Sequence, residues 1–473
     1  MKEPAPFEVR RAKKKRLLPL WAWFAIPVVA ALMAYPIAVA VTGARLEGEL
    51  RRLRASGAPV TLAEAAPPRV PDDQNAALLY EQAFQLLPAG PELEADRGET
   101  TQIGFFISSD ETDRAKVTLR SIEEILSRRS LAFALLEQAA ARPACRFPVN
   151  WEAGPGALLP HLGKIRGVAR MLAARALVDA KHGDTPKALR DITLIFRICD
   201  HISSEPTLIA QLVRFACQGI ALNTLNRVMQ SAPLSAADAR RMYEALRKID
   251  NVRPFTHSME GQRCMGLWVF DAVRRDPATA WALLRNFSGQ LFTEDERRRA
   301  QFTARLLTLL GLPFLNQDQV FYIKHTSVVV AASRLPFRDA QKRYAALQQS
   351  VEALPWYAII TRMMSPVFSR ATEARDKSVA RIGLAQHAMA LRVFQIETGQ
   401  YPASLAQLRA KVKWPLPPDP FTGKDFVYRR AGAGYLLYSI GPNMRDEGGT
   451  DQRSFRGAPG HYPPDDIPCR MTR

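Results

Sequence analysis

The stretch SSEPTLIAQLVRFACQGIALNTLNRVM, residues 203–229, decides the fold of this chain. Pro206 stands near its start, where proline is favoured because its missing N–H needs no partner in the first turn of a helix. Beyond that residue, apolar side chains occupy nearly every side of the expected helix. This pattern is typical of a helix that is buried all round. The stretch therefore predicts a central, buried helix.

Helical patterns continue on both sides of this stretch. Residues 75–87, NAALLYEQAFQLL, repeat apolar side chains at helical spacing, with the leading asparagine as N-cap. A further helix over 162–182 stops at Gly183, and Asp184 caps the next one. This hairpin resembles a single tetratricopeptide-type unit, but no second copy follows at the required period. We therefore expect a multi-helical body rather than a repeat array.

An uncharged run of 26 residues, 17–42, lies near the N-terminus. About 20 apolar residues suffice to cross a bilayer as a helix, and Trp21 and Trp23 suit the headgroup level at one end. Seven Lys/Arg residues precede the run within 1–16, against four in 43–60, so the positive-inside rule puts the N-terminus in the cytoplasm. We expect a single-pass anchor in the bilayer of a bacterial inner membrane, with an extracytoplasmic body. A cleaved signal peptide is the alternative, although its apolar core is typically about 7–15 residues long.

The overall composition bounds the class of protein. A chain of 473 residues suggests two or three domains, and its net charge of +19 allows contact with anionic lipid, envelope polymer or nucleic acid. The basic residues are scattered, and no basic strip is interleaved with aromatic residues as single-strand binding requires. We therefore expect no nucleic-acid partner. Five cysteines without a CxxC pair indicate neither a zinc ribbon nor a redox pair.

One polar constellation stands out in the helical region, whereas searches for nucleophile elbows, P-loops and HExxH motifs find nothing. In HSMEGQRCMGLW, residues 257–268, His257, Glu260 and Cys264 fall on one helical face, and Arg263 is adjacent. A metal ion can use that spacing. The alternative is a buried polar cluster in which a Glu–Arg pair supports helix packing.

The last quarter of the chain changes character. SVARIGLAQHAMALRVFQIETG, residues 378–399, is a helix that ends at Gly399, and YPASLAQL leads into a second, short helix. PPDPFTGK then supplies turn residues. The strands DFVYRR, 425–430, and GYLLYSIG, 434–441, follow as a β-hairpin.

This order of elements resembles the globular part of the major pseudopilin of type II secretion systems. The stretches that carry the resemblance are GQYP (399–402), PDPFTGK (418–424), YRR (428–430), YSIGP (438–442) and DEGGTD (446–451). The resemblance covers about 375–455 and implies a small α+β module. This chain lacks the prepilin leader and the glutamate at the fifth mature position, and its apolar run lies over 300 residues upstream.

The resemblance also implies a calcium-holding loop. It would place the ion on Asp446 and Asp451, with Asn443 and Glu447 as further ligands. Calcium takes six to eight oxygens, so backbone carbonyls would complete the set. The alternative is an exposed acidic turn, and Arg445 within the loop favours it.

We therefore expect a mainly α protein with an N-terminal transmembrane helix, a helical extracytoplasmic body and a C-terminal α+β module. The expected parts are a basic cytoplasmic tail (1–16), the transmembrane helix (17–42), a linker (43–73), the helical domain (74–370), the pseudopilin-like module (371–455) and a flexible tail (456–473). The expected function is that of a membrane-anchored scaffold or adaptor with protein partners in the cell envelope, linked to secretion or pilus-like machinery. The alternatives are a metal-dependent enzyme or metal-binding protein centred on 257–264, and a basic surface for envelope polymer.

Overall fold

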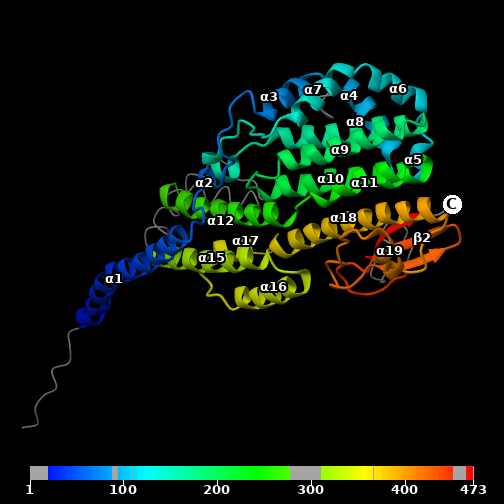
Figure 1. Cartoon of the computed structure of the whole chain (residues 1–473). Helices are drawn as coiled ribbons and strands as arrows, with labels where there is room; N and C mark the ends of the chain where they lie inside the picture. The colour runs from blue at the N-terminus through cyan, green and yellow to red at the C-terminus, as the bar shows by residue number, and fades with distance from the viewer. Residues whose placement is uncertain are drawn as a thin grey trace, which may run out of the picture.

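A computed structural model describes residues 20–87, 94–108, 110–276, 311–365, 367–450 and 465–471. The described chain is mainly helical, with a small antiparallel sheet near its C-terminus and an apolar helix at its N-terminus (Figure 1). The expected fold class is confirmed at this level. Asp451, which the resemblance names as a calcium ligand, lies outside the described residues.

A helical bundle forms the larger part of the body. Its long helices are α8 (Pro160–Lys181), α9 (Thr185–His201), α10 (Leu208–Ser231) and α11 (Ala236–Arg247). Helix α10 packs against α8, α9, α12 and α18, and more than half of its residues are buried. The prediction of a central, buried helix is confirmed. The predicted α8–α9 hairpin is also present: Gly183 has φ +83°, and the Asp184 side chain accepts a hydrogen bond from the Lys187 N–H.

Shorter helices cover the outer side of α8 and α9. They are α3 (Ala76–Gln85), α4 (Glu94–Ile107), α5 (Glu111–Arg114), α6 (Leu119–Ser127) and α7 (Ser130–Ala141). The short helix α2 (Leu62–Ala65) and the 3-10 helix η1 (Trp151–Gly156) pack instead against α12 (Val252–Arg275). The Asn75 side chain caps α3 by accepting from the Ala77 N–H, as its sequence predicts.

A second group of helices lies beside the bundle and has its own apolar cores. It comprises α12 (Val252–Arg275), α15 (Leu312–Ala332), α16 (Phe337–Glu352) and α17 (Ile359–Met364). The C-terminal part of α1 (Leu20–Ala55) packs along α15, while its N-terminal part extends away from the body (Figure 1). Two contacts fix the direction of this packing: Asn316 Nδ2 donates to Thr42 Oγ1 at 3.4 Å, and Lys324 lies 3.7 Å from Glu49. Helices α1 and α15 therefore run parallel.

The C-terminal elements share the core of the bundle. Helix α18 (Val367–Thr398) packs against α10 and α11 and also against the sheet. Helix α19 (Leu405–Val412) follows, and then the strands β1 (Val427–Ala431), β2 (Gly434–Ser439) and β3 (Ile467–Met471), in the order β1-β2-β3 and antiparallel throughout. The expected boundary between residues 370 and 371 falls inside α18.

Strand β3 lies in the segment that we expected to be a flexible tail. Ile467 is buried, and Tyr435 and Leu437 of β2 pair with Met471 and Cys469. Residues 467–471 are therefore part of the sheet rather than a tail. Apolar residues at every second position, together with the open edge of β2, account for the pairing.

Candidate functional site

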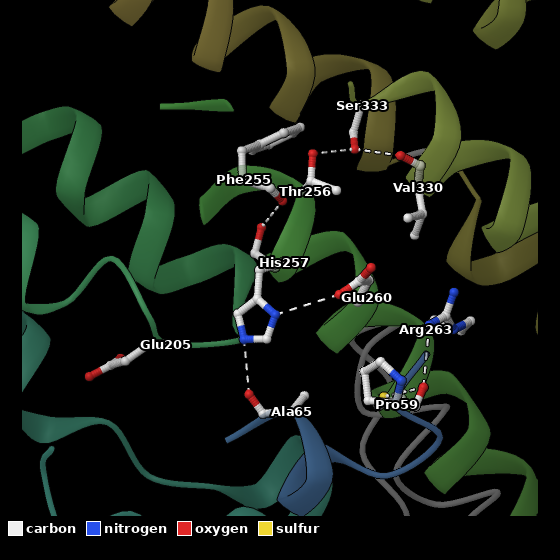
Figure 2. A network of polar contacts seen from close by, with 12 residues as sticks. Pro59, Ala65, Glu205, Phe255, Thr256, His257, Glu260, Arg263, Val330 and Ser333 are labelled. Carbon is white, nitrogen blue, oxygen red and sulfur yellow. Dashed lines mark hydrogen bonds and ion pairs between the residues drawn. The ribbon is translucent and has the colours of Figure 1, made fainter. Parts of the chain in front are cut away.

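His257 and Glu260 face one another on α12, as their spacing predicts. His257 Nδ1 lies 3.6 Å from Glu260 Oε2, while His257 Nε2–H donates to the carbonyl oxygen of Ala65 at 2.9 Å (Figure 2). Arg334, from the end of α15, approaches the other oxygen of Glu260 at 3.5 Å. The hydrogen bond from His257 and the positive charge of Arg263 lower the pKa of the Glu260 carboxyl. Glu260 is thus an ionised carboxylate with cationic neighbours.

Arg263 and Cys264 turn to a different partner. Arg263 Nη2 donates to the carbonyl oxygen of Pro59 at 3.3 Å (Figure 2). Cys264 Sγ donates to the same oxygen, also at 3.3 Å. Cys264 is fully buried, and burial raises the pKa of its thiol to about 12. A neutral thiol is a poor metal ligand and a poor nucleophile. The α12 face therefore holds the segment that follows α1, through Pro59 and Ala65.

No metal-binding group of three or more His, Cys, Asp or Glu side chains occurs within the described parts of the chain. On α12, the His257–Glu260 pair is completed by a backbone carbonyl and an arginine, not by a further ligand. A hydrogen bond from Ser333 to Thr256, 2.9 Å long, also ties α12 to the end of α15 (Figure 2). These contacts hold α12, the end of α15 and the segment that follows α1 together.

The sequence did not predict two buried pairs, each of which joins a histidine to another polar residue. His161 Nε2 lies 2.7 Å from Glu205 Oε1, and both side chains are buried. Tyr80 Oη donates to His201 Nδ1 at 2.8 Å, and burial lowers the pKa of His201 to about 4. The partners are 44 and 121 residues apart in sequence, so no local spacing announces them.

The acidic loop after β2 brings together some of the predicted calcium ligands. Asn443 Nδ2 donates to Glu447 Oε1 at 2.7 Å, and Asp446 accepts from Tyr438 Oη at 2.7 Å. The hydrogen bond from Tyr438, and then that from the Gly448 N–H, lower the pKa of the Asp446 carboxyl. Arg445 is exposed at the surface of the loop.

Asp466, just before β3, completes this cluster and was not predicted. One of its carboxylate oxygens accepts from the N–H groups of Glu447 and Gly449, at 3.0 and 2.7 Å. Burial raises the pKa of Asp466 to about 6, and the Glu447 carboxylate adds to the effect. The other oxygen of Asp466 and Glu447 Oε2 are both buried and have no hydrogen-bond partner. A Cβ at Gly441 would overlap the Asp465 carbonyl, so only a glycine at this position lets the segment before β3 lie against the loop.

A cluster of three aromatic residues, two of them exposed, lies at the start of α15 and just before α17. The ring of Phe314, near the start of α15, is 4.9 Å from that of Tyr357 and 5.9 Å from that of Trp356. Trp356 is 74% exposed and Phe314 is 44% exposed. The buried carboxylate of Asp318 on α15 accepts hydrogen bonds from the N–H groups of Ile360 and Thr361, in the first turn of α17. These bonds hold the start of α17 against α15. Ile359 and Met363 of α17 are exposed as well.

No protein-family model, curated protein or solved structure matches this chain.

Proposed function

We propose that the chain is a single-pass membrane-anchored scaffold or adaptor whose helical body and C-terminal module lie outside the cytoplasm. The observation that carries the proposal is the bare apolar surface of α1, and the exposed aromatic cluster at the start of α15 supports it. Each of these features is unusual on the surface of a soluble protein, and together they suit one apolar environment.

The first of these features is α1 itself. Its large apolar side chains are open to the surroundings over a long stretch, with Leu32 68% exposed and Ile37 62% exposed. Two described helices are long and apolar enough to span a bilayer, the segments Val28–Ala55 and Leu208–Ser231. The second is α10, which is mostly buried and forms the core, whereas the apolar window of the first has no buried residues. A bilayer would cover this surface.

The aromatic cluster lies where the apolar run ends. Asn316 contacts Thr42, and Phe314 precedes Asn316 by two residues on α15. Tryptophan and tyrosine favour the headgroup level, where one end of the ring is apolar and the other is wet. Phe314, Trp356 and Tyr357 would therefore rest on the outer surface of the membrane and give the body a second contact beside α1.

Topology and processing are tested with one pair of fusions. Alkaline phosphatase at the C-terminus, which is active only outside the cytoplasm, should be active, and a green fluorescent protein fusion should be dark. The chain should remain in the membrane after carbonate extraction and keep its N-terminal residues on sequencing. Loss of those residues would indicate a cleaved signal peptide, and an inactive phosphatase would contradict the orientation.

The adaptor role is tested at the hairpin between β1 and β2. Deletion of 375–455 would remove most of α18 and disrupt the shared core, so a photoreactive residue at exposed Ala431 is the better probe. Irradiated cells should yield a cross-link to a component of secretion or pilus-like machinery. The same residue at exposed Arg343 of α16 should not. Identical products from both positions, or none from Ala431, would contradict the adaptor role.

We also propose that the acidic loop binds calcium, with Glu447 and Asp466 as ligands beside Asp446. The buried oxygens of Glu447 and Asp466 that lack partners support this, because unpaired buried carboxylates are unfavourable and hard cations prefer such oxygens. The bound cation would neutralise the two carboxylates and join the loop to β3. Calcium should raise the thermal midpoint of the full chain after chelator treatment. The E447Q/D466N variant should show no such rise, and a magnesium response equal to that of calcium would contradict calcium selectivity.

The metal-dependent enzyme centred on 257–264 has less support. Arg263 and Cys264 are engaged with Pro59, and His257 with Ala65. These contacts favour the packing alternative for that cluster.

A further inference from the structure

An open pocket of about 660 Å³ lies between α4, α8, α10 and α18, away from the α12 cluster and the acidic loop. Ligand pockets commonly have volumes of about 300–1,000 Å³. Its charged lining residues are Arg166, Arg170 and Arg381, and its hydroxyl-bearing lining residues are Thr100, Thr101 and Ser108. Phe215 supplies a buried aromatic ring to the lining.

All the charged side chains that line this pocket are positive. Its lining includes three arginines but neither aspartate nor glutamate. Arg166 and Arg170 lie one turn apart on α8, and in the described chain neither forms an ion pair with a carboxylate. Burial lowers the pKa of Arg170, and the neighbouring charge of Arg166 lowers it further. Two like charges at this spacing destabilise a helix, so the arrangement has a cost that a bound anion would remove.

Helix α10 extends the same electrostatic pattern. Arg227 follows the pocket residue Asn223 by one turn and donates to the Phe106 carbonyl oxygen of α4 at 3.0 Å. Burial, and then repulsion from Arg114, lower the pKa of Arg227 to about 10. Since this guanidinium is paired with a neutral carbonyl, its charge adds to the positive potential of the groove.

Arg381 of α18 lies next to a glycine of α10. A Cβ built on Gly219 of α10 would lie 3.8 Å from Arg381 Nη1, so the guanidinium of α18 lies directly over this residue. The third arginine thereby reaches the groove that Arg166 and Arg170 line from α8. Guanidinium groups from two helices then converge on one volume.

We propose that this pocket binds a phosphate-bearing ligand. Guanidinium groups match the tetrahedral oxygens of phosphate with paired hydrogen bonds, and hydroxyl groups add donors. A phosphate ester carries up to two negative charges near neutral pH and offers three acceptor oxygens, so it suits three arginines better than one carboxylate does. The ligand is either a soluble phosphate ester or the headgroup of an anionic phospholipid. The inference is independent of the proposed anchor and adaptor roles.

The test is calorimetric titration of the full chain, in non-ionic detergent, with inorganic pyrophosphate. The wild type should bind it saturably, and the R166Q/R170Q variant should bind about tenfold more weakly or worse, because charge-assisted hydrogen bonds are lost. Without ligand, the variant should unfold at the same or a higher temperature, since like-charge repulsion is removed. That result excludes misfolding as the cause of weak binding.

A matched control keeps the net charge equal. R338Q/R343Q removes two exposed arginines of α16 that lie outside the pocket lining, and should bind pyrophosphate as the wild type does. No saturable binding by the wild type up to about 1 mM, or equal loss in both variants, would overturn the proposal.

Two competitors distinguish the sources of the ligand. Glycerol 3-phosphate and dihexanoyl phosphatidic acid carry the same phosphate monoester and differ in their acyl chains. Equal displacement of pyrophosphate by both supports a soluble phosphate ester, whereas much stronger displacement by the lipid supports a headgroup site. Displacement by neither would overturn the assignment of a phosphate ester.

Discussion

The polar cluster on α12 and the acidic loop after β2 differ in how their carboxylates are satisfied. On α12, the Glu260 carboxylate has both His257 and Arg334 as partners, and Arg263 donates through Nη2 to a backbone carbonyl, although its buried Nε has no partner. In the loop, Glu447 and Asp466 each keep a buried oxygen without a partner. A carboxylate with cationic partners holds segments together, whereas unsatisfied carboxylates that lie together indicate a missing cation. The comparison assigns a structural role to the first cluster and a binding role to the second.

The largest expected effect tests whether α12 is fixed by close backbone packing. A Cβ at Gly261 would overlap the Pro206 carbonyl oxygen, so G261A should lower the free energy of unfolding by about 3 kcal/mol. Chemical denaturation followed by circular dichroism measures this. G163A on α8, where a Cβ would meet nothing within 4 Å, is the matched control and should stabilise by about 0.5–1 kcal/mol. A neutral G261A variant would mean that α12 can shift freely.

The next effect concerns how Asp466 makes the stability of the folded chain depend on pH. Its pKa is raised to about 6 in the folded chain, from an ordinary value of 3.8. Between those values the folded state holds the proton more tightly than the unfolded state does, so stability falls as pH rises from about 4 to 6.

D466N removes this titration and keeps an acceptor for the Glu447 and Gly449 N–H groups. In chelator, the variant should match the wild type near pH 4 and become more stable by about 1 kcal/mol above pH 6. The difference between the two thermal profiles measures the effect, because all other groups titrate in both. Saturating calcium should reverse the order at pH 7. A difference that does not change with pH would contradict the unpaired carboxylate.

The helical body could be predicted because its signals are local. The Asn75 and Asp184 caps act within three residues, and the apolar surface of α10 is contained in one stretch. The spacing of His257 and Glu260 in the sequence also predicted that they share one helical face. It could not show that Cys264 faces Pro59, because that contact joins residues 205 positions apart.

Long-range pairing accounts for what was missed. Strand β3 is defined by its register with β2, and Asp466 enters the loop only through that pairing. The arginine pocket had a partial signal, since Arg166 and Arg170 stand one turn apart on α8. Arg381 joins them from α18, which no local spacing relates to α8.

The smallest expected effect lies in the α12 cluster and distinguishes its two alternatives. Arg334 is largely exposed, so E260Q should change the free energy of unfolding by less than about 1 kcal/mol, and the coupling to R334Q in a double-mutant cycle should be of the same order. Because the pKa of Glu260 is lowered in the folded state, this small contribution is present near neutral pH and disappears on acidification. Zinc added to the full chain should leave the thermal midpoints of wild type and E260Q equally unchanged. A zinc-induced rise in the wild type that E260Q abolishes would instead make His257 and Glu260 metal ligands, and the comparison with the acidic loop would then be one between two cation sites.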